Sequence, residues 1–202
     1  MKLLRLGNNG NEKPAIIDKD GNYRDLSSIV NDFNPDTLNF DTIETIKNAD
    51  ISNLPKLGSN LRIGACVSKP SKFIGIGLNF KDHAEEQNLP IPKEPIIFSK
   101  FTSCITGPND PIVVPKGSNH TDWEVELGFV IGKKATNVSI DDALDHVLGF
   151  FLVNDLSERD FQKNKGLTWD KGKGFDTFGP IGPYIVTKDE LPDFQKLNMS
   201  LD

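Results

Sequence analysis

The sequence predicts an α+β fold in which β-strands predominate and helices are few and short. Short apolar runs rich in Val, Ile and Phe recur along the chain, and clusters of Gly, Pro, Asn and Asp separate them. Helix-start patterns occur at a few positions, and the stretches that follow them are brief. With 37% hydrophobic and 26% charged residues among 202, the composition is that of an ordinary globular protein.

Residues 1–69 are predicted to form a small N-terminal domain that contains β-strands. Its expected elements, in chain order, are strands at 2–6 and 15–18, a turn at Asp20-Gly21-Asn22, and helical signals at 27–33 and 42–48. Residues 51–70 are rich in Pro, Gly, Ser and Asn, which is typical of a linker. We therefore place a domain boundary near residue 69.

Residues 70–202 are predicted to form the second, larger domain. Its expected strands span residues 72–77, 96–100, 112–114, 123–131, 149–154 and 180–187. Asn79-Phe80-Lys81-Asp82 has the pattern of a helix start, and Ser139-Ile140-Asp141-Asp142 resembles a capping box that opens a helix over 140–146. The last residues, Leu197-Asn-Met-Ser-Leu201-Asp202, predict the middle of a further strand.

Two glutamates share one face of the strand predicted over 123–131. Because side chains alternate across a strand, Glu124 and Glu126 lie opposite the apolar face that begins with Trp123 and Val125. Neighbouring carboxylates repel each other and lose hydration when buried, and a divalent cation compensates both effects. Asp155 follows the next apolar run and adds a third carboxylate at a strand end. The alternative is a solvent-exposed polar face, which is common on antiparallel sheets.

Three carboxylates without cysteine, and without an obvious histidine partner, would form an all-oxygen site. Such a donor set favours Mg²⁺, Mn²⁺ or Ca²⁺ over Zn²⁺. Water and substrate oxygens would complete the coordination shell.

A histidine and a glutamate three residues apart form a candidate general base. His83 and Glu86 would be neighbours on a helix, and a carboxylate beside an imidazole raises its basicity. An ordinary surface pair is the alternative. The preceding GxG lacks the third glycine of a dinucleotide-binding loop, because Phe80 stands there. Further along, glycines flank Lys173, so its ammonium group could approach a substrate carbonyl, unless the loop is a solvated basic turn.

Composition and charge argue against several classes of partner. The formal net charge is −6 with acidic and basic residues mixed, so neither nucleic acid nor an anionic membrane is an expected partner. No window approaches the roughly 20 apolar residues of a membrane span, and the opening residues lack the apolar stretch of a signal peptide. Cys66 and Cys104 are expected to be reduced core residues, and a cytoplasmic location is predicted.

These motifs, in this order, resemble the fumarylacetoacetate hydrolase family. The matching segments are GLNFKDHAEE, PIIFSKFTSCITGP, DWEVELGFVIG, NDLSERDFQ and GKGFDTFGPIGP. The opening MKLLRLG and EKPAIID resemble a bacterial subgroup labelled ureidoglycolate lyase or 2,4-diketo-3-deoxy-sugar-acid hydrolase. The resemblance implies a mixed β-roll catalytic domain, usually paired as a homodimer, with Mg²⁺ or a similar ion in its site.

The resemblance also implies a role for each of eight positions. The segment that carries His83 and Glu86 can order as a lid over substrate in relatives. Carried over by position, the eight are the metal ligands Glu124, Glu126 and Asp155, the water-activating dyad His83 and Glu86, the charge-stabilising Lys173, and the substrate-side Arg159 and Gln162.

The reaction that we expect is hydrolysis of a C–C bond in a small 2,4-dioxo acid of the acylpyruvate type. The metal would polarise the 2-oxo acid, Glu86 would orient His83, His83 would take a proton from water, and Lys173 would help stabilise the enolate that is released. The sequence leaves open a ureidoglycolate-type lyase, a dienedioate isomerase or tautomerase, and an oxaloacetate-type decarboxylase, because pocket shape decides among them.

Members of this family continue with several more strands and a Gly-Thr-Pro-Gly type loop that helps to hold substrate. The resemblance therefore predicts a C-terminally truncated chain. It also leaves a rival of another class, a non-catalytic remnant that dimerises or binds a ligand.

Overall fold

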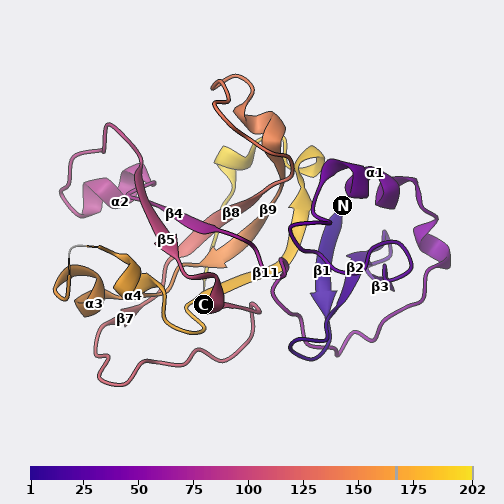
Figure 1. The fold of residues 1–202 in the computed structure, drawn as a ribbon, viewed down its shortest axis with the longest axis horizontal. Coiled ribbons are helices and arrows are strands. Elements are labelled where there is room, and N and C mark those ends of the chain that lie inside the picture. Colours follow the sequence, from indigo (N-terminus) through magenta and orange to yellow (C-terminus); the bar gives the residue numbers. More distant parts are fainter. Residues whose placement is uncertain (167, 202) are drawn as a thin grey trace.

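A mixed, seven-stranded sheet runs through the computed structural model, which describes residues 1–166 and 168–201. Its order is β3-β2-β1-β11-β9-β8, and β6 lies parallel to β11 (Figure 1). The strands are β1 (Lys2–Leu6), β2 (Lys13–Ile17), β3 (Tyr23–Asp25), β4 (Phe73–Gly77), β5 (Ile96–Lys100), β6 (Ile105–Thr106), β7 (Thr121–Asp122), β8 (Val125–Ile131), β9 (Val147–Asn154), β10 (Ser157–Glu158) and β11 (Gly179–Thr187).

The helices are short and lie outside the sheet. The α-helices are α1 (Phe40–Asn48), α2 (Lys81–Glu86), α3 (Arg159–Lys163) and α4 (Asp170–Lys173). Single 3-10 turns are η1 (Ile51–Asn53), η2 (Thr102–Cys104), η3 (Ala143–His146), η4 (Lys188–Glu190) and η5 (Phe194–Lys196). Within the described residues, no helix has the length and apolar character needed to cross a membrane.

The N-terminal strands belong to the same sheet as the strands of the second half. β1 pairs antiparallel with β11, with Leu3 opposite Ile185. The main hydrophobic core also joins the halves, since Leu3 and Phe33 pack in one cluster with Leu148 and Ile185. Both the sheet and the core thus include residues from either side of position 69. The division into two domains at that point stays a prediction.

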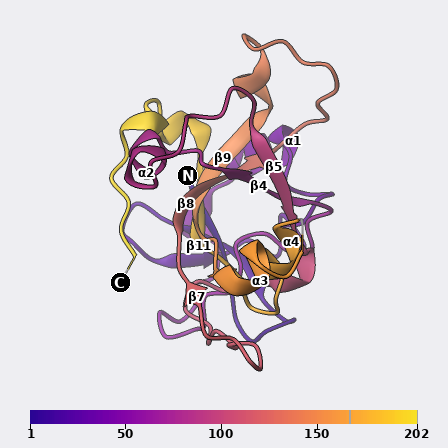
Figure 2. The same ribbon diagram turned by 90° about the vertical axis from the view of Figure 1, so that its left-hand side faces the viewer.

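A second layer faces one end of this sheet. β4 and β5 form an antiparallel hairpin, and β7 pairs with β10. Figure 2 shows β8, the β4–β5 hairpin, α3 and α4 arranged around a common centre. These elements carry four of the eight predicted site residues, which are Glu126, Arg159, Gln162 and Lys173.

Most predicted strands are confirmed, with bounds that shift by one or two residues. The strand over 112–114 is wrong, because the Val113 amide donates to Thr177 Oγ1 at 2.8 Å and the segment has no strand partner among the described residues. The strand over the chain end is wrong for residues 197–201, which are irregular; Asp202 lies outside the described residues.

The helix predictions were less accurate. The signal at 42–48 corresponds to α1, whereas 27–33 forms turns, because the Asp25 and Asp32 carboxylates accept from the Ser27 and Phe33 amides instead. The capping contact at Ser139 does form, with its Oγ 3.2 Å from the Asp142 amide, but it opens only the turn η3. Ile140 is exposed, so this segment has little apolar surface with which to stabilise a longer helix.

Candidate active site

All eight predicted site residues line one cavity of about 1210 Å³. They come from α2, α3, α4, and the ends of β8 and β9. The predicted set is His83, Glu86, Glu124, Glu126, Asp155, Arg159, Gln162 and Lys173. Segments that are up to 90 residues apart in sequence, from His83 to Lys173, thus contribute to the same space.

The pairing of β8 with β9 brings two of the three carboxylates together. Val125 lies opposite Asn154, so the residues just outside this pair, Glu124 and Asp155, are neighbours at the strand ends. The Asp155 amide donates to the Glu124 carbonyl at 2.9 Å, and the Glu124 amide donates to Asn154 Oδ1 at 3.2 Å. The Glu124 side chain is 22% exposed, so a fully solvated polar face does not describe it.

Lys173 joins these two carboxylates. Its Nζ lies 2.6 Å from Glu124 Oε2 and 2.7 Å from Asp155 Oδ2, and its side chain is 2% exposed. Gly172 permits this placement, because a Cβ there would come within 2.6 Å of the Glu158 carbonyl and the Gln162 amide. The solvated basic turn considered for this lysine is therefore wrong.

Lys100 does not line the cavity but supports two residues that do, and the sequence analysis gave it no role. Its buried Nζ lies 2.6 Å from Asp155 Oδ1 and donates to the Lys173 carbonyl at 2.6 Å. Burial lowers the pKa of Lys100. Burial also opposes ionisation of Asp155, but Lys100 and Lys173 outweigh it and hold the pKa of Asp155 below its usual value. One signal was available: Lys100 alternates with Ile96 and Phe98 on the inward face of β5.

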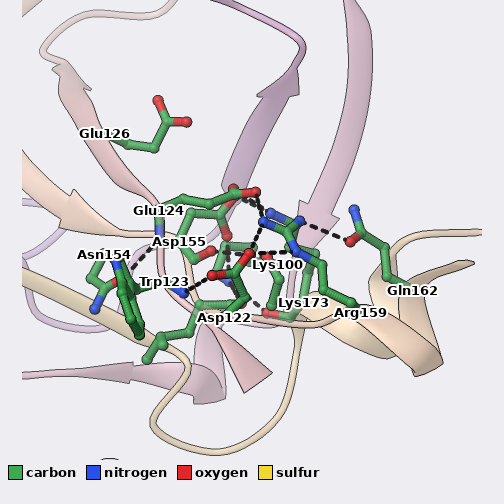
Figure 3. A network of polar contacts seen from close by, with 12 residues as sticks. Lys100, Asp122, Trp123, Glu124, Glu126, Asn154, Asp155, Arg159, Gln162 and Lys173 are labelled. Carbon is green, nitrogen blue, oxygen red and sulfur yellow. Dashed lines mark hydrogen bonds and ion pairs between the residues drawn. The ribbon is translucent and has the colours of Figure 1, made fainter. Parts of the chain in front are cut away.

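Arg159 connects Glu124 to Asp122 and Gln162 (Figure 3). Its Nη2 lies 2.6 Å from Glu124 Oε1 and 2.7 Å from Asp122 Oδ2, and its Nη1 donates to Gln162 Oε1 at 3.1 Å. Burial disfavours the charged guanidinium, yet the two carboxylates raise the pKa of Arg159 above its ordinary value. Asp122 was also missed, and its place directly before Trp123-Glu124 gave no separate signal.

Glu126 stands apart from this network. In Figure 3 its carboxylate lies away from the ion pairs that surround Glu124 and Asp155. It accepts a hydrogen bond from Asn79 Nδ2 at 2.9 Å. Burial raises the pKa of Glu126 to about 7, and the negative charges of Asp155 and Glu124 add to this effect, while Asn79 opposes it. Lys173 also opposes the rise through its charge, but among the described residues no Lys, Arg or His forms an ion pair with this half-buried carboxylate.

The donor chemistry at this end of the sheet fits a hard divalent cation. Glu124, Glu126 and Asp155 offer oxygen ligands, and Glu126 is the carboxylate that most lacks a positive partner. Within residues 1–166 and 168–201, however, no group of three His, Cys, Asp or Glu side chains is drawn together closely enough to hold an ion. Glu126 would have to approach the other two for all three to bind one ion.

The predicted dyad lies at the rim of the cavity. His83 Nδ1 is 3.6 Å from Glu86 Oε2, which is longer than a hydrogen bond. The His83 side chain is 44% exposed and that of Glu86 is 76% exposed. The Asn79 cap predicted for this helix is wrong, since Phe80 is the N-cap residue and the Asn79 side chain contacts Glu126 instead.

Comparison with known proteins gives a consistent result. The profile described as "Fumarylacetoacetate (FAA) hydrolase C-terminal" matches residues 72–202. A protein of Burkholderia lata described as a "putative hydrolase" is 55% identical over 202 residues, which is 100% of this chain and 72% of that protein.

Two solved structures share the fold and support the β-rich fold class predicted from the sequence. Fumarylacetoacetate hydrolase from Exiguobacterium antarcticum has a TM-score of 0.76 and 31% identity, covering 94% of this chain and 67% of its own. 5-carboxymethyl-2-hydroxymuconate delta-isomerase from Mycobacterium smegmatis has a TM-score of 0.65 and 29% identity, covering 93% of this chain and 66% of its own.

Proposed function

Because this chain belongs to the fumarylacetoacetate hydrolase family, we propose that it is a metal-dependent hydrolase that cleaves a C–C bond in a small 2,4-dioxo acid. One observation carries the proposal: the three candidate metal ligands, Arg159 and Lys173, and the His83–Glu86 pair all line the same cavity. A family whose members include hydrolases and isomerases uses such groups for 2-oxo acid chemistry.

The charges in the cavity suit an anionic 2-oxo acid. Arg159 presents a planar guanidinium beside Gln162, and such a fork binds carboxylates well. When bound by Glu124, Glu126 and Asp155, a divalent cation would supply Lewis-acid polarisation of the 2-oxo group. Mg²⁺ is our first choice, with Mn²⁺ or Ca²⁺ as alternatives.

The residues of the chain would then handle the proton and the developing charge. Glu86 would orient His83 once their 3.6 Å separation closes to hydrogen-bond distance. His83 then accepts a proton from water, and the water oxygen attacks the remote C4 carbonyl carbon. The C3–C4 bond breaks, C4 leaves as a carboxylic acid, and its bonding pair passes to C3 as the enolate of a pyruvate unit. The Lys173 ammonium stabilises that negative charge, and the proton held by His83 is available to C3.

A second candidate is an isomerase that moves a double bond in a dienedioate. The likeness to the Mycobacterium smegmatis isomerase favours it. Such a reaction needs proton transfer by the same dyad but no attacking water.

Product analysis separates these candidates. The purified chain is incubated with acetylpyruvate, oxaloacetate or a 2-hydroxydienedioate in Mn²⁺, and the products are followed by ultraviolet absorbance and mass spectrometry. Our proposal expects pyruvate and acetate from acetylpyruvate, and no turnover in Glu124→Ala. A shifted double bond without cleavage would instead establish the isomerase, and metal binding with no turnover on any substrate would support the non-catalytic remnant.

We also propose that the protein works as a homodimer in the cytoplasm. The support lies on the outer face of the sheet, where Phe129, Ile131 and Leu152 are at least 40% exposed and β8 forms an open edge. An apolar sheet face of this kind is typical of a subunit interface.

A further inference from the structure

Residues 78–95 leave the body of the molecule between β4 and β5 and return to it, carrying α2 and the His83–Glu86 pair. Figure 1 shows this excursion projecting from the end of the hairpin. Only Ala84 is buried within it. Its backbone hydrogen bonds, such as that from the Gln87 amide to the His83 carbonyl at 3.1 Å, are local. Apolar packing therefore gives little stability to the segment that bears the predicted general base.

One side-chain hydrogen bond joins this excursion to the sheet. Asn79 Nδ2 lies 2.9 Å from Glu126 Oε2, across 47 positions in sequence. A carboxylate can only accept, so the amide nitrogen of Asn79 must point toward it. Within the part of the chain that the structure describes, no other side-chain hydrogen bond links residues 78–95 to the rest of the protein.

The backbone before Asn79 is arranged to make this contact. The ring of Trp169 packs so closely on Gly77 that a Cβ there would lie 2.3 Å from it, which fixes the end of β4. Leu78 then adopts φ 49°, a left-handed conformation that a branched side chain rarely takes. Residues hold such a conformation where the surrounding contacts require it. The turn at Leu78 brings Asn79 over the sheet instead of into the helix cap.

We propose that Asn79 is a positioning residue that couples the two halves of the site. It orients the Glu126 carboxylate through Oε2 and leaves Oε1 free for the metal as Glu126 approaches Glu124 and Asp155. Through the same bond this approach draws residues 78–95, with His83, over the cavity. This inference rests on the proposed metal site and assigns a role to a residue outside the predicted ligands and dyad. Metal binding at Glu126 and order in the excursion should therefore depend on each other.

The test compares Asn79→Leu, which keeps the size of the side chain but has no donor, with the matched control Gln87→Leu. Gln87 lines the same cavity on the same excursion, and its side chain has no hydrogen bond among the described residues. Calorimetry measures Mn²⁺ affinity, and hydrogen–deuterium exchange follows the amides of residues 78–95 with and without Mn²⁺. Loss of a residue that orients a metal ligand typically costs about 10- to 100-fold in affinity.

We expect Asn79→Leu to bind Mn²⁺ at least about 10-fold more weakly and to lose the Mn²⁺-dependent slowing of exchange in residues 78–95. Gln87→Leu should retain both properties. In the metal-free protein, Glu126→Ala should also speed exchange in residues 78–95, because it removes the acceptor of the Asn79 hydrogen bond. Asn79→Ala serves if the leucine variant does not fold.

Wild-type affinity and wild-type exchange in Asn79→Leu would overturn the inference while leaving the proposed function intact. Failure of the unmodified chain to bind Mn²⁺ would overturn both.

Discussion

Lys100 Nζ and Asp155 Oδ1 lie 2.6 Å apart and form an ion pair, and both residues are almost completely buried. The same ammonium group donates to the carbonyls of Leu156 and Lys173. Lys100 therefore ties the β4–β5 hairpin to the end of β9 and to α4. Three separate segments around the cavity depend on this one cation.

Replacing Lys100 with methionine should reduce the free energy of unfolding by roughly 3 kcal/mol, because a buried carboxylate loses its ion-pair partner and two carbonyls lose their donor. Urea denaturation measures the loss. Lys196→Met is the control, since Lys196 pairs with Asp193 at 82% and 53% exposure and should cost less than about 1 kcal/mol. Equal losses in the two variants would contradict the prediction.

His83→Ala should lower turnover of an acylpyruvate by roughly 10²-fold or more, as expected for a lost general base. Mn²⁺ affinity should stay unchanged, since the carboxylates are intact. Steady-state kinetics and calorimetry measure the two quantities, and His146→Ala, on the remote turn η3, is the control. A parallel loss of Mn²⁺ affinity would show that His83 acts on the metal site instead.

Asp110 should stabilise the fold above about pH 4 and lose that effect in acid. Arg62 donates to it at 2.7 Å, and this contact is the main reason that the pKa of Asp110 falls to about 2 from its ordinary value of 3.8. A lowered pKa means that the stability is present above the unfolded pKa and disappears as pH falls through about 2. Because solvent screens this pair, Asp110→Asn should cost about 1 kcal/mol at pH 7 and little near pH 2, measured by denaturation across pH. An equal cost at both pH values would refute this account.

Phe129→Asp should convert a dimer into a monomer. Phe129 is 55% exposed on β8, and a charge there would disfavour burial against a second copy. Light scattering after gel filtration should give twice the 22.4 kDa protomer mass for the unmodified chain and one protomer for the variant. Ile140→Asp changes a residue that is 93% exposed in the connection between β8 and η3, outside the sheet, and should leave the dimer intact. A monomeric unmodified chain would rule out the proposed assembly.

Local periodicity accounts for what could be predicted about the fold and the site. The strand over 96–100 has the predicted bounds, and alternation placed Glu124 and Glu126 on one side of their strand. Helical spacing placed His83 near Glu86. Each of these relationships depends on backbone geometry within a few residues, which the sequence specifies directly.

Other features depended on partners that are distant in sequence. The Asn79 amide was expected to cap a helix, but it bonds to Glu126, 47 positions away. Lys100 ends a strand whose local sequence is ordinary, and only the packing of that strand brings it to Asp155.

The sequence by itself determined the β-rich class, the family motifs and the residue types that make up the site. Only the tertiary structure decided which cation neutralises which carboxylate, and that Glu126 stays outside the network that Lys173 and Arg159 form. The physical reason is that secondary structure follows from short-range backbone geometry, whereas ion pairs follow from how separate strands and helices pack. A buried charge must find its partner wherever packing brings one within reach.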